Sequence, residues 1–195
     1  MIQPMIYLVP RWAGNIHSDW YDWLVEQVFA TYKIEIKQLE MPNWQEPQVE
    51  ESLEYLSKTI QHLDEHTYFI GHSVGCQSIL RYLSSHLELN NDLKIGGILL
   101  VAAWFEVDKP WISLVPWMNH DETNFSLIAK AVNYKKVILS NNDPFTSDFA
   151  KNKAEWENKI QANVGVFAEK LHFNTPTDSA VLAEVEKMIL FAFNQ

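Results

Sequence analysis

The chain has 195 residues and a mass of 22.7 kDa, which suits one domain spanning residues 1–195 and leaves little room for two. With 47% hydrophobic and 21% charged residues, it has the composition of a globular protein with a sizeable core. Its 25 acidic and 15 basic residues give a net charge of −10, which repels phosphate backbones and anionic lipid, so we expect neither a nucleic-acid nor a membrane partner.

The expected location of the protein follows from three features of the chain. Its single cysteine, Cys76, cannot form an internal disulfide, which is typical of a reducing compartment. No apolar run reaches the roughly 18 residues of a membrane span. The first residues lack the basic-then-apolar order of a signal peptide, because Pro4 and Pro10 enclose only a short apolar run. We therefore expect a cytoplasmic protein.

Apolar runs of strand length alternate along the chain with segments of helical period. The first run, residues 5–9, ends at a proline, and Ser18 or Asp19 is a plausible cap for the helix that follows. In chain order we expect strands at 5–9, 34–39, 67–70, 97–102, 134–140 and 164–168, and helices at 19–30, 49–63, 74–87, 148–162 (with Ser147 as its cap) and 179–193.

This alternation predicts an α/β fold: three layers, doubly wound, with a mostly parallel sheet of about six strands. The segment 104–125 interrupts it, since several aromatic residues stand there between a strand and the next helix. Loops of this length in a compact domain are usually functional or disordered, and the aromatic content argues against disorder. The segment is therefore interpreted as a lid or a pocket wall, with an ordinary packed excursion as the alternative.

The motif that indicates chemistry is Gly71-His72-Ser73-Val74-Gly75, which matches G-x-S-x-G. It stands between a predicted strand and a predicted helix, as a nucleophile elbow requires. A nucleophile on so sharp a turn has a strained backbone, and the flanking glycines let neighbouring chains approach closely. The start of the helix also directs free N–H groups toward a developing oxyanion. Ser73 is therefore the predicted nucleophile.

A serine hydroxyl needs a base to take its proton, and the chain offers seven histidines. His172 follows the last strand run and precedes the final helix, where the carboxyl edge of the sheet would hold a base. His72 is adjacent to Ser73, but its side chain should point away from the site. His62 and His66 do not form the H-E-x-x-H pattern, so no metal site is expected. His17 follows the first strand closely enough to line a pocket.

The third group must be a carboxylate that orients the imidazole. Asp143 directly follows the strand at 134–140, and the chain order Ser73, Asp143, His172 is the order of α/β hydrolases. Asp-Pro also opens turns, so a loop-capping role is the alternative. The main rival acid is Asp108, which follows the preceding strand, and Asp121 and Asp178 are weaker rivals.

An oxyanion hole needs two donors. One is the backbone N–H of Val74, and the other should come from the loop after the first strand, where Trp12 is our choice. If the second strand lies outside the first and the third lies on its other side, the crevice opens between strands one and three, which brings the Trp12 loop to Ser73.

The chain resembles the small α/β-hydrolase-fold serine hydrolases of the YdeN and retinoblastoma-binding-protein-nine type. The likeness rests on V-P after the first strand, the W-Y-D-W-L helix, M-P, G-H-S-V-G, G-I-L-L-V-A-A, N-D-P-F and H-F-N-T. It implies a minimal α/β-hydrolase fold, the roles of nucleophile, acid and base for Ser73, Asp143 and His172, and activity on small ester-type substrates with no cofactor. The L-x-C-x-E motif of one relative is absent, so no protein partner is carried over.

Two positions depart from these relatives, which usually have glycine where this chain has Arg11 and tend to have it where this chain has Leu171. Arg11 either alters the oxyanion loop or brings a cation to an acidic group of the substrate. The first hypothesis is a serine hydrolase acting on small carboxylic esters or related acyl substrates, with Arg11, His17, Trp104, Trp111 and Trp117 lining the pocket. The alternatives are an inactive or weakly active binding module on a hydrolase scaffold, or an acyltransferase.

Overall fold

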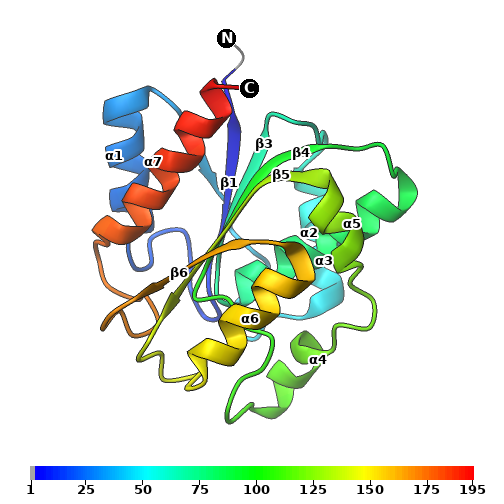
Figure 1. Cartoon of the computed structure of the whole chain (residues 1–195), viewed down its shortest axis with the longest axis vertical. Coiled ribbons are helices and arrows are strands. Elements are labelled where there is room, and N and C mark those ends of the chain that lie inside the picture. Colours follow the sequence, from blue (N-terminus) through cyan, green and yellow to red (C-terminus); the bar gives the residue numbers. More distant parts are fainter. Residues whose placement is uncertain (1–2) are drawn as a thin grey trace.

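A computed structural model describes residues 3–195 and contains a six-stranded sheet in which all paired strands are parallel (Figure 1). In sheet order the strands are Ile36–Gln38 (β2), Met5–Val9 (β1), Thr67–His72 (β3), Ile95–Val101 (β4), Val132–Ser140 (β5) and Asn163–Phe167 (β6). The helices are Tyr21–Tyr32 (α1), Val49–Thr59 (α2), Val74–Leu89 (α3), Val115–Met118 (α4), Phe125–Ala131 (α5), Phe149–Ile160 (α6) and Ser179–Phe193 (α7), with a 3₁₀ turn at Ile112–Leu114 (η1). This confirms the predicted α/β class with a parallel sheet of about six strands, and β2 and β3 lie on either side of β1, which was the arrangement considered for the crevice.

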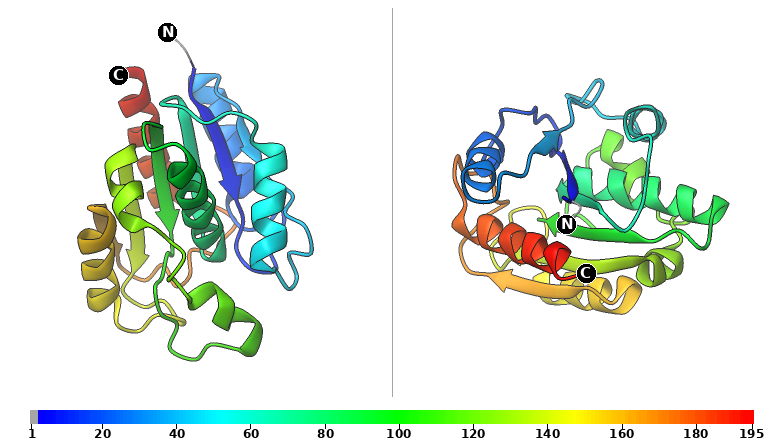
Figure 2. Two further views of the ribbon diagram at one scale, coloured as in Figure 1. Left: turned by 90° about the vertical axis from the view of Figure 1, so that its right-hand side faces the viewer. Right: turned by 90° about the horizontal axis from the view of Figure 1, so that it is seen from above.

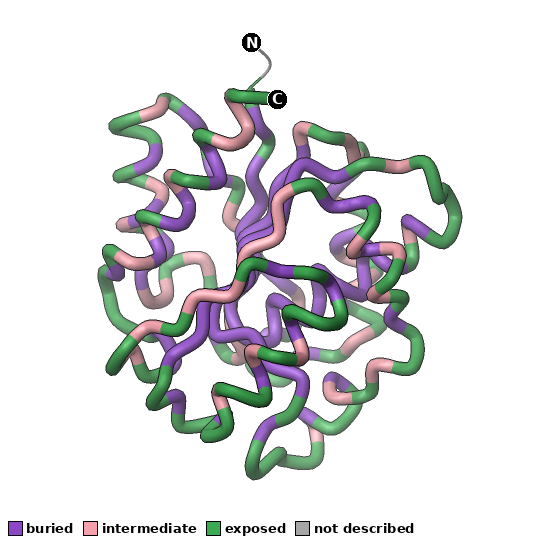
Figure 3. The backbone as a smooth tube through the Cα atoms, viewed as in Figure 1, coloured by how far each residue is buried: buried purple, intermediate pink, exposed green. Residues whose placement is uncertain are grey.

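The helices cover both faces of the sheet, which makes three layers (Figure 2). Because side chains alternate across a strand, Ile6 and Leu8 of β1 pack with α1 and α7, while Tyr7 and Val9 face the opposite layer, which contains α2, α3, α5 and α6. The central strands β3 and β4 are buried along their whole length (Figure 3). A strand that is buried on both faces has a continuous apolar sequence, so these two strands could be predicted from the sequence.

Several boundaries differ from the prediction at helix starts. Helix α1 begins at Tyr21 with Trp20 at the N-cap position and no side-chain cap, because Asp19 pairs with Arg11 instead. Helix α6 is capped by Asp148, whose carboxylate accepts from the backbone N–H of Lys151, and not by Ser147. Short capping residues stand next to one another at both places, so sequence alone does not choose between them.

The segment 104–125 contains η1 and α4 and packs against the start of the buried helix α3. Arg81 of α3 fastens it, since its guanidinium donates to the carbonyl of Trp117 at 2.9 Å and also to that of Asn119. Burial lowers the pKa of Arg81 to about 10.

Within residues 3–195, none of the helices has both the length and the apolar character needed to cross a membrane.

Candidate active site

Ser73 occupies a sharp turn between β3 and α3. Its φ of 54° and ψ of −118° are unusual for a residue with a side chain. The flanking glycines allow this turn to pack. A Cβ on Gly71 would lie 2.9 Å from the Cα of Cys76, and one on Gly75 would lie 2.4 Å from the carbonyl oxygen of Val9. The turn therefore brings the start of α3 against the end of β1, as a nucleophile elbow requires.

His172 and Asp143 meet at the carboxyl edge of the sheet. Nδ1 of His172 lies 2.8 Å from Oδ2 of Asp143, and both side chains are more than nine-tenths buried. Asp143 follows β5, and its other carboxylate oxygen accepts from the backbone N–H of Phe145 at 2.9 Å. Since a carboxylate only accepts, Nδ1 carries the proton and Nε2 is the basic nitrogen. The pair therefore has the geometry of an oriented general base.

The loop that holds His172 is fastened to the loop that holds Asp143. Oγ of Ser140 accepts from the backbone N–H of Lys170 at 3.0 Å, and the amide oxygen of Asn142 accepts from that of Leu171 at 2.9 Å. Leu171 has a φ of 49°, in the left-handed region that favours glycine. The chain therefore has a strained leucine directly before His172, at the position where the similar hydrolases tend to have glycine.

Ser73 and His172 line the same cavity, whose volume is about 240 Å³. The wall is largely apolar and aromatic, and it takes four side chains from the segment 104–125. The lining residues are Arg11, Trp12, Ser73, Val74, Trp104, Val107, Trp111, Leu114, Phe145, His172 and Asn174. Three of the five predicted pocket residues are therefore present, namely Arg11, Trp104 and Trp111.

The other two predicted pocket residues lie elsewhere. His17 is exposed and pairs with Asp22, its Nδ1 lying 2.9 Å from Oδ2. Trp117, in helix α4 of the segment 104–125, is fully buried, and its indole N–H donates to the carbonyl of Pro47 at 3.0 Å. Trp117 contributes to packing because its ring meets that of Trp44 edge to face at 6.3 Å.

The two predicted oxyanion donors, Trp12 and Val74, both line the cavity. The Trp12 loop is braced from behind by Trp44, whose indole N–H donates to the carbonyl of Arg11 at 2.6 Å and whose own carbonyl accepts from Ala13. The left-handed residue of this loop is Ala13, with a φ of 54°, and not Arg11. The absence of glycine at position 11 therefore requires no strain there.

The guanidinium of Arg11 is held by a carboxylate of the protein itself. Its Nε and Nη2 donate to the two oxygens of Asp19, at 2.6 and 3.2 Å. Its Nη1 donates to the carbonyl of Trp12 at 3.0 Å, so the same side chain also fixes the orientation of the Trp12 loop. Arg11 thus stabilises the conformation of the loop that holds Trp12, and it also lines the cavity.

A buried polar cluster behind the elbow escaped the sequence analysis. His72, which is completely buried, places Nε2 2.8 Å from the carbonyl oxygen of His172 and Nδ1 2.8 Å from the hydroxyl of Tyr21. That hydroxyl also accepts from the backbone N–H of Arg11 at 3.0 Å. Burial, with a smaller contribution from His172, lowers the pKa of His72 well below its ordinary value. The sequence predicted that the side chain of His72 points away from the site, and His72 does not line the cavity, but the sequence did not reveal its partners.

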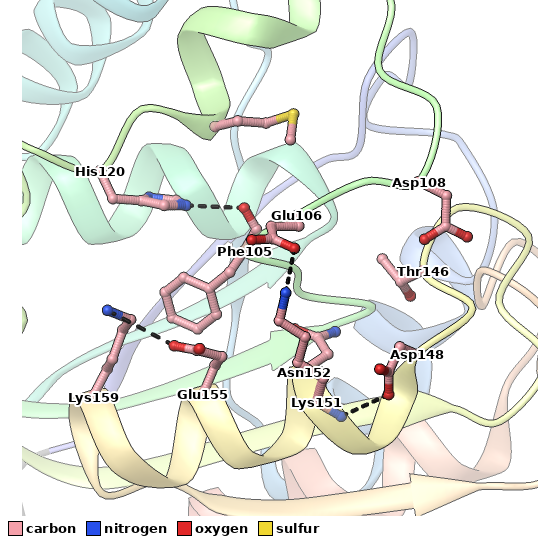
Figure 4. Close-up of a pocket in the computed structure, with 11 residues that line it drawn as sticks. Phe105, Glu106, Asp108, His120, Thr146, Asp148, Lys151, Asn152, Glu155 and Lys159 are labelled. Atoms are coloured by element: carbon pink, nitrogen blue, oxygen red, sulfur yellow. Dashed lines mark hydrogen bonds and ion pairs between the residues drawn. The ribbon is translucent and has the colours of Figure 1, made fainter.

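The rival acids have other positions. Asp108 lines a second cavity, of about 260 Å³, where it lies beside Thr146 and Asp148, and its Oδ2 accepts from the backbone N–H of Ser147 (Figure 4). Asp178 caps α7 through the backbone N–H groups of its first turn. Asp121 is exposed on the surface beside α5. Of the four candidate acids, Asp143 is the one hydrogen-bonded to His172.

Comparisons with known proteins give matches over most of the chain. A family model described as serine hydrolase matches residues 6–189. The YdeN protein of Bacillus subtilis (strain 168) is 31% identical over 153 residues, which is 77% of each chain. The crystal structure of the B. subtilis ydeN gene product superposes with a TM-score of 0.81 at 23% identity, covering 99% of this chain and 100% of that one. Est1E from Butyrivibrio proteoclasticus, solved with ferulic acid bound, gives a TM-score of 0.69 at 10% identity, covering 98% and 90%.

Proposed function

We propose that this chain, which belongs to the serine hydrolase family, cleaves small carboxylic esters through an acyl-enzyme formed on Ser73. The observation that carries the proposal is the 2.8 Å hydrogen bond between Nδ1 of His172 and Asp143, at a cavity that Ser73 also lines. A base oriented in this way and a nucleophile on an elbow are the two parts that acyl transfer requires.

In the proposed mechanism, Nε2 of His172 takes the proton of Ser73 as Oγ attacks the ester carbonyl. Asp143 keeps the imidazole in the tautomer that makes Nε2 the base, and it stabilises the imidazolium that forms. The backbone N–H groups of Val74 and Trp12 hold the negative oxygen of the tetrahedral intermediate. His172 then protonates the leaving alcohol, and water releases the acyl group by the same steps.

The cavity indicates the kind of acyl group. A volume of about 240 Å³ is below the roughly 300–1,000 Å³ of sites for drug-sized ligands, so we expect a short aliphatic or single-ring acyl group. The edge-to-face pair of Trp12 and Trp111, with ring centroids 5.0 Å apart, offers apolar surface for it. We further propose that the segment 104–125 is a fixed pocket wall, because Arg81 anchors its backbone from below.

Intact-mass spectrometry after treatment with a fluorophosphonate tests this function. We expect one adduct on the parent protein and none on Ser73→Ala. Labelling of His172→Ala and Asp143→Asn should be slower by about 10³-fold or more, and hydrolysis of p-nitrophenyl acetate should fall in parallel. A folded parent protein that neither forms an adduct nor hydrolyses the ester would overturn the proposal and favour a binding module on this scaffold.

A further inference from the structure

The side chain of Trp104 lies against the nucleophile. Its indole N–H donates to Oγ of Ser73 at 3.3 Å, and Trp104 is only 2% exposed. Most buried indole N–H groups have an acceptor, and within residues 3–195 the acceptor of Trp104 is the hydroxyl of Ser73. The bond therefore joins the ring to the atom that would carry the acyl group.

The backbone around Trp104 is held on both sides. The side-chain amide of Gln77 donates to the carbonyl of Trp104, and that of Asn152 donates to the carbonyl of Ala103 at 2.8 Å. These two donors come from α3 and α6, so two helices fix the position of the indole relative to Ser73. A donor fixed in this way needs no reorganisation when charge develops at its acceptor.

We propose that Trp104 is a catalytic residue of deacylation, where its N–H stabilises Oγ of Ser73 as the leaving group. This inference rests on the proposed esterase function. It concerns a different atom from the oxyanion hole, since Val74 and Trp12 would hold the former carbonyl oxygen, whereas Trp104 contacts Oγ itself.

The state of Oγ changes through the cycle, and the strength of this hydrogen bond changes with it. In the free enzyme Oγ is a hydroxyl oxygen and accepts from the indole. In the acyl-enzyme Oγ is the single-bonded oxygen of an ester, a weaker acceptor, so the buried N–H of Trp104 is poorly satisfied. This contrast raises the free energy of the acyl-enzyme relative to the states on either side of it.

During deacylation, Nε2 of His172 takes a proton from water as the water oxygen bonds to the acyl carbon. The bond between that carbon and Oγ then breaks, and its electron pair moves to Oγ. His172 returns the proton to Oγ, which leaves a carboxylic acid and free Ser73. Negative charge grows on Oγ while the bond breaks, and a hydrogen bond to a charged acceptor is stronger than one to an ester oxygen. Trp104 therefore favours the transition state over the acyl-enzyme.

The test is the kinetics of Trp104→Phe with p-nitrophenyl acetate, for which the acyl-enzyme and its hydrolysis can be followed separately. We expect kcat to fall about tenfold or more and KM to fall as well, so that kcat/KM falls by a clearly smaller factor than kcat, because the free hydroxyl is already a better acceptor than the ester oxygen. Rapidly quenched samples should show more acyl-enzyme by intact mass than the parent protein does.

Trp156→Phe is the matched control, because Trp156 is also fully buried and its indole N–H lacks a partner within residues 3–195. It makes the same chemical change and leaves a similar gap in packing, so kcat and KM should stay near the parent values. Replacing Trp104 by benzothienylalanine, which has sulfur in place of N–H at nearly equal size, should reproduce the Trp104→Phe result. It decides the question if the phenylalanine variant folds poorly.

The outcomes separate the two proposals. If the parent protein hydrolyses the ester but both Trp104 variants lose kcat and kcat/KM equally, without accumulating acyl-enzyme, the role of Trp104 is only structural and the inference is wrong. If the parent protein does not hydrolyse esters or react with a fluorophosphonate, the esterase function itself fails.

Discussion

His72 donates a hydrogen bond from Nε2 to the backbone carbonyl of His172, across 2.8 Å. Because a carbonyl only accepts, this contact places the ring proton on Nε2, so Nδ1 must accept from the hydroxyl of Tyr21. That hydroxyl in turn accepts from the backbone N–H of Arg11. A chain of hydrogen bonds donated in one direction, from Arg11 to Tyr21 to His72 to His172, therefore links the Trp12 loop to the loop that holds His172.

Tyr21→Phe removes the central link of this chain. It leaves Nδ1 of His72 and the N–H of Arg11 without a partner, in surroundings where both are buried or partly buried. We expect kcat for p-nitrophenyl acetate to fall about five- to tenfold with KM changed little, since the variant loosens reacting groups and not the acyl pocket.

The control is Tyr134→Phe, since Tyr134 lies in the half of β5 remote from the cavity and its ring packs against that of Phe191 at a tilt, with centroids 5.2 Å apart. It should react with a fluorophosphonate at the parent rate, whereas Tyr21→Phe should react more slowly. Equal rates for the two variants would mean that the chain does not position the proposed base.

The neutral state of His72 predicts that stability depends on pH. Burial lowers the folded-state pKa of His72, and it also lowers that of His120, whereas both are ordinary histidines in the unfolded chain. The unfolded state therefore binds more protons below about pH 6.5, and stability present above that pH is lost as the pH falls.

Urea denaturation at pH 7.5, 6.5 and 5.5 measures this effect. We expect the free energy of unfolding to fall between pH 6.5 and 5.5, with a slope of up to about 1.4 kcal/mol per pH unit for each such histidine. His72→Gln retains an amide N–H and a carbonyl acceptor but does not titrate, so its slope should be smaller. An unchanged slope would assign the pH dependence to other groups.

Leu171 predicts a stabilising substitution. It is 51% exposed and has a φ of 49°, so its side chain packs little while its backbone is strained. Leu171→Gly should raise the free energy of unfolding by up to about 1 kcal/mol, because glycine adopts this conformation without a steric penalty. Leu89→Gly is the opposite case, since Leu89 is exposed at the end of α3, and it should lower stability by about 1 kcal/mol. If Leu171→Gly and Leu89→Gly lowered the free energy of unfolding by the same amount, the backbone at Leu171 would not be strained.

The sheet and the elbow could be predicted because local patterns specify them. Strands β3 and β4 are continuous apolar runs, and the glycines at 71 and 75 mark a turn of fixed geometry. The strand β2 is shorter than the expected 34–39, and the start of α1 differs because an ion pair of Asp19 with Arg11 replaced the expected cap. Such a pairing depends on how loops meet, which no local pattern encodes.

The same limit explains the site residues that sequence reasoning placed wrongly or missed. Trp117 and Trp111 stand in one aromatic segment, yet one is fully buried and the other lines the cavity, since the backbone turns between them at η1. The contacts of Tyr21 with His72 and of Trp104 with Ser73 join residues far apart in the chain. These contacts form because the sheet brings together loops that are far apart in the chain, so the sequence alone does not identify the partners.

Gly75→Ala tests how closely the elbow and the oxyanion loop must approach. Alanine would favour the helix in isolation, but its Cβ would lie 2.4 Å from the carbonyl oxygen of Val9 and 2.7 Å from that of Pro10. Both contacts are with backbone, so β1 and the Trp12 loop must move away from Ser73. We expect fluorophosphonate labelling to slow at least tenfold and stability to fall by about 1–3 kcal/mol. Ser78→Ala, one turn further along α3, should affect labelling little, and labelling of Gly75→Ala at the parent rate would show that this close approach is not required.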